Sequence, residues 1–176
     1  LKLKFQGITS KPAGVLSKLN VKVKLFNETT EKATDYKTAE FTADDSGIWS
    51  GQASFDVNVN NKYILYVKGP YHIQKKVCDE KPTETAGGTY SCDKGKITLT
   101  AGNNSLDLSG IVLLAGDLPD QDGTINAYDT SLIRNNLGKT DNDKCDVNRD
   151  GKCDTQDYSL IISTLSVSSV IIILQV

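Results

Sequence analysis

The sequence predicts a mainly β N-terminal domain, residues 1–115, followed by a small α-helical domain, residues 116–166. Three observations support this division. Apolar and polar residues alternate through the first part, turn-forming residues divide it into short segments, and a pattern that repeats after 28 residues begins near Gly116. With 176 residues, of which 38% are hydrophobic, the chain is long enough for two small domains with separate cores.

The first part contains about seven short strand-like segments. Apolar residues alternate with lysine in LKLKF, residues 1–5, and in VKVKL, residues 21–25, as expected of strands with one buried face. Clusters of Gly, Asn, Asp and Pro separate the further apolar runs. This spacing favours an immunoglobulin-like β-sandwich. In addition, FTADDSGIWSGQASF, residues 41–55, is similar to the central hairpin of bacterial extracellular Ig-like modules.

The composition argues against nucleic-acid binding and against catalysis. A net charge of −2 provides no basic surface for nucleic acid or for an anionic membrane. The single histidine, His72, lies in a strand-like segment, so no Ser-His-Asp or Cys-His set can be assembled around it. Carboxylates in the first domain lie mostly in turns and form no glycosidase motif. We therefore expect a protein that is not an enzyme.

Four cysteines fall into two local pairs, which predict the disulfides Cys78–Cys92 and Cys145–Cys153. Disulfides persist in oxidising compartments, so we expect an extracellular or cell-surface protein. Free thiols or a four-thiolate zinc site are the alternatives, although neither pair has the spacing of a zinc knuckle. The first bridge would close a loop rich in Pro, Thr and Gly and contribute ~3 kcal/mol by the chain-entropy model.

The pattern changes in the second part. Residues 117–157 contain ten Asp, no Glu and five Lys or Arg. INAYDTSLIRNNLG, residues 125–138, aligns with CDTQDYSLIISTLS, residues 153–166, at a constant offset of 28, and Gly123 and Gly151 keep the same offset. This indicates an internal duplication of a loop followed by a short amphipathic helix, with the two helices packed on each other.

Oxygen-bearing side chains in the second copy follow the spacing of an EF-hand loop. Counted from Asp146, they occupy positions 1, 3, 5, 9 and 12, and Gly151 occupies position 6, where the chain turns sharply. Carboxylates crowded in this way repel one another unless a cation lies between them, and six to eight oxygens favour Ca²⁺ over Mg²⁺. A solvated Asp-rich turn is the alternative. The expected ligands are the side chains of Asp146, Asn148, Asp150 and Asp157 and the carbonyl of Lys152, with Asp154 reaching through water.

The first copy has thirteen residues where the loop should have twelve. Aligned from its C-terminal end, it places Leu118 at the first position, where a side-chain oxygen is needed. A one-residue bulge around Pro119 would let Asp117 serve instead. The expected ligands of a second calcium ion are therefore the side chains of Asp117, Asp120, Asp122 and Asp129 and the carbonyl of Thr124.

Two duplicated calcium loops, each followed by one helix, resemble a dockerin module over roughly residues 116–166. The resemblance implies a plug that binds two calcium ions and a cohesin-like protein, attaching a secreted protein to a scaffold or cell surface. A β-sandwich just upstream is common in such proteins. Carried over to this sequence, the positions that contact the partner are Ala127, Tyr128, Arg134 and Asn135 in the first repeat, and Thr155, Gln156, Ile162 and Ser163 in the second; the alternative for Ile162 is a place in the core.

The second cysteine pair departs from the dockerin pattern. Cys153 stands where the family usually has a β-branched residue that bridges the two loops, and Cys145 directly precedes the first expected ligand. A disulfide between them would lower the entropy of the loop when calcium is absent. We hypothesise that this loop stays partly preformed without calcium.

The last ten residues, VSSVIIILQV, residues 167–176, carry no charged side chain. They are too short to span a bilayer, which takes about 20 residues, so we expect a packed hydrophobic tail or a terminal strand. Donation of that strand to another copy would make the chain a subunit of a filament or surface array. A third possibility is a polysaccharide-binding accessory module, for which the candidate aromatic residues are Trp49, Tyr63, Tyr66 and Tyr71.

Overall fold

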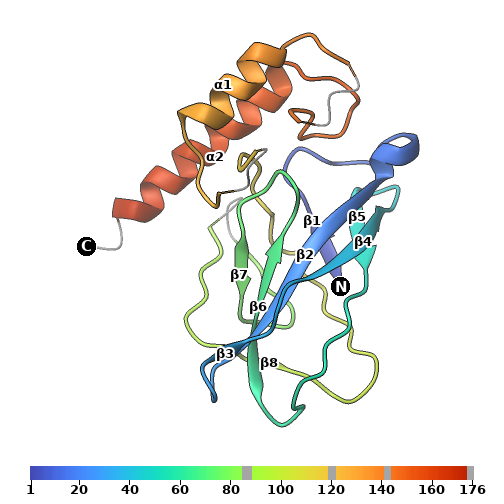
Figure 1. The fold of residues 1–176 in the computed structure, drawn as a ribbon, viewed down its shortest axis with the longest axis vertical. Helices are drawn as coiled ribbons and strands as arrows, with labels where there is room; N and C mark the ends of the chain where they lie inside the picture. Colours follow the sequence, from blue (N-terminus) through green and yellow to red (C-terminus); the bar gives the residue numbers. More distant parts are fainter. Residues whose placement is uncertain (85–88, 119–121, 141–143, 174–176) are drawn as a thin grey trace.

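The computed structural model describes residues 1–84, 89–118, 122–140 and 144–173, and side chains as far as Val167. Figure 1 shows a β-rich region with two helices at one end. The β-rich region followed by two C-terminal helices agrees with the predicted order of a β part and a small helical part.

The eight strands of the described residues form one antiparallel sheet in the order β1-β5-β4-β2-β6-β7, with β3 paired to β2 and β8 to β6. A short 3₁₀ helix, Gly14–Ser17, precedes β2. The strands are β1 (Lys2–Lys4), β2 (Lys18–Asn27), β3 (Lys32–Ala33), β4 (Lys37–Ala43), β5 (Ile48–Gly51), β6 (Lys62–Lys68), β7 (Lys75–Val77) and β8 (Ile97–Thr98).

Strand β2 is central because it pairs with both β4 and β6. Its residues alternate as the sequence predicts: Leu19, Val21, Val23 and Leu25 are buried, while the lysines between them are more exposed. Full burial of such a side chain contributes roughly 1.5–3 kcal/mol, so this one strand supplies a substantial part of the core.

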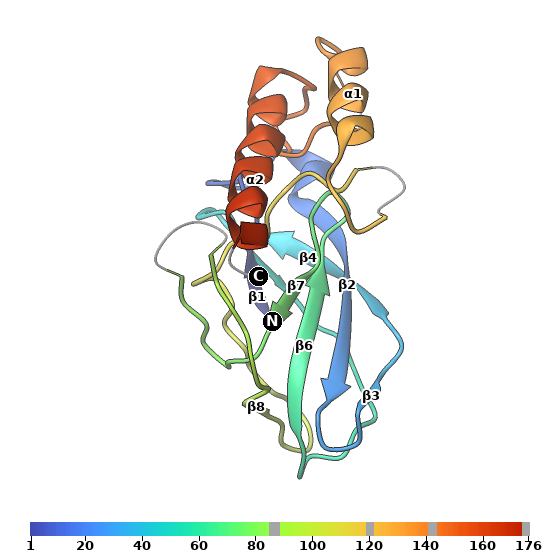
Figure 2. The same cartoon turned by 90° about the vertical axis from the view of Figure 1, so that its left-hand side faces the viewer.

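The sheet curves into a half-barrel and differs from the expected sandwich of two facing sheets (Figures 1 and 2). Residues 105–115, one of the apolar runs that the sequence pattern groups with the strands, cover the core but pair only through isolated bridges. Asp107 interrupts the run because its Oδ1 accepts hydrogen bonds from the backbone N–H and hydroxyl of Ser109, at 3.1 and 2.6 Å. Apolar residues of the segment still fill the core, namely Leu106, Leu108, Ile111 and Leu113.

Two of the aromatic residues considered for polysaccharide binding belong to the core. Trp49 and Tyr63 are buried, and Trp49 packs edge-on against Phe5 with ring centroids 5.6 Å apart. Tyr66 and Tyr71 are half-buried. Buried rings cannot stack on a sugar, so this surface does not favour polysaccharide binding.

Helices α1 (Ala127–Asn136) and α2 (Thr155–Ile173) begin 28 residues apart, as the duplicated pattern predicts. They lie side by side in both views (Figures 1 and 2). The equivalent residues Ile133 and Ile161 are both fully buried in one apolar cluster, together with Leu118 and Val147. The two repeats therefore share a core of their own.

The end of the chain forms no strand as far as Ile173. Helix α2 continues through residues 167–173, so this stretch is helical, while residues 174–176 lie outside the described residues. Extending a helix that is already nucleated fixes one residue per added hydrogen bond, which is easier than starting a new strand. Of the helices described, none is both long and apolar enough for a membrane span.

The helical region packs directly on the β region. The guanidinium of Arg149 donates to the carbonyl oxygens of Leu16 and Lys18, both at 3.1 Å. The Thr164 hydroxyl donates to Oε1 of Gln6 at 2.9 Å. These bonds join α2 and its preceding loop to β2 and to the segment that follows β1.

Candidate metal-binding loops

Side chains of the loop before α2 accept hydrogen bonds from its own backbone. The two carboxylate oxygens of Asp146 accept the N–H groups of Asp150 and Gly151, at 3.1 and 3.0 Å. Asn148 accepts the N–H of Asp150 at 3.0 Å, and Asp150 accepts that of Lys152 at 2.9 Å. Gly151 makes the turn with φ +91°, a conformation that other residues adopt only with strain. These expected ligands therefore lie around one tight turn.

Asp157 closes the loop from the first turn of α2. Its side chain is fully buried, and its Oδ1 accepts the N–H groups of Val147 and Asn148, at 2.8 and 3.2 Å. Its Oδ2 accepts the N–H of Asp154 at 2.9 Å. One carboxylate thus joins the start of the loop, its ninth position and the helix.

The loop before α1 repeats these hydrogen bonds. Asp117 accepts the N–H of Gly123 at 3.3 Å, and Asp129 accepts that of Leu118 at 2.8 Å. Asp117 therefore occupies the place of Asp146, and the buried Leu118 that of Val147. Asp122 accepts the N–H of Thr124 at 2.8 Å, as Asp150 does that of Lys152. The bulge expected around Pro119 and the expected ligand Asp120 both belong to residues 119–121, which lie outside the described residues.

Side chains of the two loops also cap the helices, a role that the spacing of the expected metal ligands alone does not reveal. The side chain of Asn126 accepts the N–H of Tyr128 at 2.7 Å, and Asp129 accepts the N–H of Asn126 at 2.8 Å, which is a capping box. Asp154 accepts the N–H of Gln156 at 2.7 Å in the second repeat. The sequence signal for these caps is an Asn or Asp three residues before an Asp, as in Asn126 and Asp129 and in Asp154 and Asp157. Each loop and its helix therefore form one structural unit.

Burial raises the pKa of Asp146 and of Asp157, because removal from water disfavours the charged carboxylate. The carboxylate of Asp150 raises the pKa of Asp146 further, against the effect of the N–H donors. Within the described ranges no three His, Cys, Asp or Glu side chains already form a metal cluster. The expected metal-ligand atoms of these loops are nevertheless all oxygen atoms, which suit a hard cation such as Ca²⁺.

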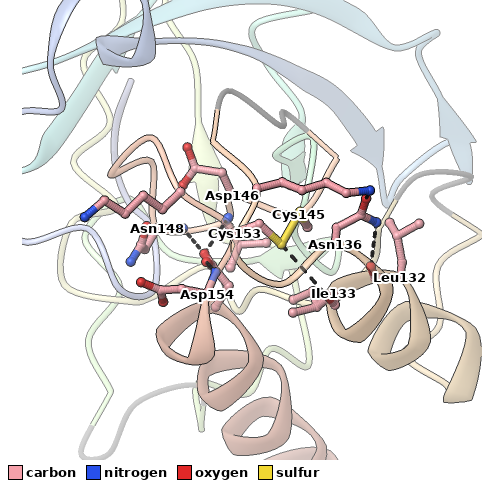
Figure 3. The surroundings of a disulfide bond; sticks show 12 residues. Leu132, Ile133, Asn136, Cys145, Asp146, Asn148, Cys153 and Asp154 are labelled. Atoms are coloured by element: carbon pink, nitrogen blue, oxygen red, sulfur yellow. Dashed lines mark hydrogen bonds between the residues drawn. A yellow bond between two sulfur atoms is a disulfide. The ribbon is translucent and has the colours of Figure 1, made fainter.

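Both predicted disulfides are present. Figure 3 shows the Cys145–Cys153 bond beside Ile133 and next to Asp146. Cys153 also exchanges backbone hydrogen bonds with the segment after α1, accepting from Gly138 at 2.8 Å and donating to Lys139 at 2.9 Å. The bridge therefore anchors the second loop to the segment that leads out of the first repeat.

Sequence reasoning missed two residues near the first loop because they belong to the β region. The ammonium of Lys68, at the end of β6, donates to Oδ2 of Asp117 and, at 2.9 Å, to the carbonyl oxygen of His72. His72 is buried, and its ring nitrogens have no hydrogen-bond partner in the described part of the chain. Burial lowers the pKa of His72 to about 3, with a smaller contribution from the positive charge of Lys68, so the imidazole is neutral at pH 7.

The residues expected to contact a partner lie at the surface. The exposed side chain of Tyr128 is 58% accessible, and that of Ile162 is 42% accessible, so Ile162 is not in the core. Ser163 is also exposed but lines a cavity shared with the β region, between Gln6 and Leu114. The remaining expected positions are exposed as well: Ala127, Arg134, Asn135, Thr155 and Gln156.

Residues 115–166 match the family model of the dockerin type I domain. This part of the chain is a dockerin-like module. Dockerin modules are non-catalytic, bind calcium through EF-hand-like loops and mediate protein–protein assembly. The match covers less than a third of the chain, so it does not extend to the β region. No curated protein matched the chain in a direct comparison.

Proposed function

We propose that this chain attaches its β region, residues 1–115, to a cohesin-type scaffold through a calcium-dependent dockerin-like module at residues 116–166. The observation that carries this proposal is the double role of Asp129 and Asp157. Each accepts backbone N–H groups from its loop and also from the residue that caps its helix. A cation held by the loops would therefore order the helices that present the partner-binding residues.

The module takes two calcium ions, one in each loop. In the second loop the ligands are the side chains of Asp146, Asn148, Asp150 and Asp157, with the carbonyl of Lys152 and a water held by Asp154. In the first loop they are the side chains of Asp117, Asp120, Asp122 and Asp129 and the carbonyl of Thr124. Two equivalent backbone donors support this pairing of the loops, since Gly123 and Gly151 bond to Asp117 and Asp146.

The partner binds chiefly to the first repeat. Tyr128 and Arg134 lie exposed on α1, and tyrosine and arginine are residue types that often dominate binding energy. On the second repeat, Ser163 borders the β region, and Thr164 and Leu160 contact it near Gln6 and Gly7. A partner therefore has freer access to α1 than to this side of α2.

The two disulfides support an extracellular or cell-surface location. The alternative of a donated C-terminal strand loses support, because residues 167–173 belong to α2.

Binding to immobilised type I cohesin, in calcium and then in chelator, tests the proposal. Replacing Tyr128 with Ala should weaken calcium-dependent binding about tenfold or more, as expected for an anchor residue. Tyr36→Ala is the matched control, because Tyr36 is a 41% exposed tyrosine of the β region. Binding that survives chelation, or equal effects of the two variants, would contradict the proposed role.

A further inference from the structure

The first loop contains an ion pair that has no counterpart among the described residues of the second loop. Both partners are buried: Lys68 is 7% exposed and Asp117 is fully enclosed. One oxygen of Asp117 accepts the N–H of Gly123, and the other accepts the ammonium of Lys68. A full positive charge from the β region thus already neutralises the first aspartate of this loop.

Within the described part of the chain, the equivalent aspartate of the second loop accepts hydrogen bonds from neutral donors only. Asp146 accepts the N–H groups of Asp150 and Gly151. The one arginine of that loop, Arg149, donates its guanidinium hydrogen bonds to the carbonyl oxygens of Leu16 and Lys18, so its positive charge acts on Asp146 without a direct bond to it. The two loops therefore share their hydrogen-bond pattern and differ in the charge beside the first position.

A divalent cation coordinated by Asp117 would lie close to the Lys68 ammonium. The positive charges of the cation and of the ammonium would repel each other strongly, because both are buried and little solvent screens them. Lys68 is also held by its second bond, to the carbonyl of His72 at 2.9 Å. Moving the Lys68 ammonium away from Asp117 breaks its bond to His72. The ammonium must then reach water or find other hydrogen-bond acceptors, because an unpaired buried charge is costly.

We propose that the ammonium of Lys68 occupies the place beside Asp117 that a calcium ion would take. The first loop therefore binds calcium more weakly than the second, and it binds the ion only when Lys68 moves away from Asp117. The inference rests on the proposed function, in which both loops are calcium sites. Because Lys68 ends β6, filling of the first loop is coupled to the contact between the β region and the dockerin-like module.

Calorimetric calcium titration of the full chain tests this inference. The wild type should show one tight and one weaker site, separated by at least about tenfold in affinity, the scale of a close charge-pair interaction. Lys68→Met should tighten the weaker site about tenfold or more and leave the tight site unchanged. Lys139→Met is the matched control, because it removes the same charge from an exposed lysine that lies outside both loops and whose ammonium donates to Oδ1 of Asn136.

Two equal sites in the wild type, or a weaker site that Lys68→Met leaves unchanged, would overturn this inference alone. No calcium binding by the wild type would overturn the proposed function and the inference together. A second measurement needs no variant: the NMR signal of the Lys68 side chain in the wild type should shift only as the weaker site fills. A shift during filling of the tight site, or none at all, would also overturn the inference.

Discussion

Replacing Asp157 with Ala is expected to lower the calcium affinity of the second loop about 100-fold or more, on the scale of losses seen when ligand shells are disrupted. It should also lower the free energy of unfolding of the module by about 3 kcal/mol or more, because each buried N–H left unbonded costs about 1–3 kcal/mol. Three backbone donors depend on this carboxylate: Val147, Asn148 and Asp154. Calcium titration and urea denaturation at saturating calcium measure the two effects.

Asp154→Ala is the matched control for this prediction. It removes the same charge from the same loop, but Asp154 is only half-buried and its Oδ1 accepts the N–H of Gln156 at the exposed start of α2. We expect a loss of about 1 kcal/mol, typical of a helix cap, and a smaller loss of affinity. Equal losses in the two variants would contradict the closing role assigned to Asp157.

Removing the Cys145–Cys153 bridge should have the second-largest effect. Replacing both cysteines with Ala is expected to lower the free energy of unfolding of the calcium-free module by about 2–3 kcal/mol, from the chain entropy of this short closed loop. If calcium must then order the loop as it binds, its affinity falls by up to about 100-fold, since each 1.4 kcal/mol corresponds to tenfold. Calcium titration of the variant and the wild type measures the loss.

Replacing Cys78 and Cys92 with Ala supplies the control, because it removes a disulfide from the β region. It should lower overall stability and leave calcium affinity nearly unchanged. If removal of Cys145–Cys153 also left the affinity unchanged, the second loop would not be preformed by its disulfide.

Local patterns were sufficient to predict much of the dockerin-like module. The 28-residue offset predicted that the two helices begin 28 residues apart, because loop and helix form one unit joined by Asp129 in the first repeat and by Asp157 in the second. Both disulfides followed from cysteines that are close in sequence. Such features depend on neighbours within a few residues, which is where a single sequence carries the most information.

Features that depend on distant contacts could not be predicted in the same way. Strand-like segments gave the β content, but pairing along the sheet decides between a sandwich and a half-barrel, and the Asp107 turn keeps one segment out of the ladder. The ion pair between Lys68 and Asp117 joins residues 49 positions apart, and neither position has a local pattern that predicts it. The helical end of α2 likewise depends on propagation from the loop that precedes it.

Amide hydrogen exchange, followed in calcium and in chelator, tests most directly whether calcium holds the two loop–helix units together. Chelation is expected to increase exchange in α1 (Ala127–Asn136) and in residues 155–166 of α2, and to leave β2 and β6 protected. Equal protection of both helices in calcium and in chelator would contradict this expectation, because the module would then fold without the ion on which its proposed function depends.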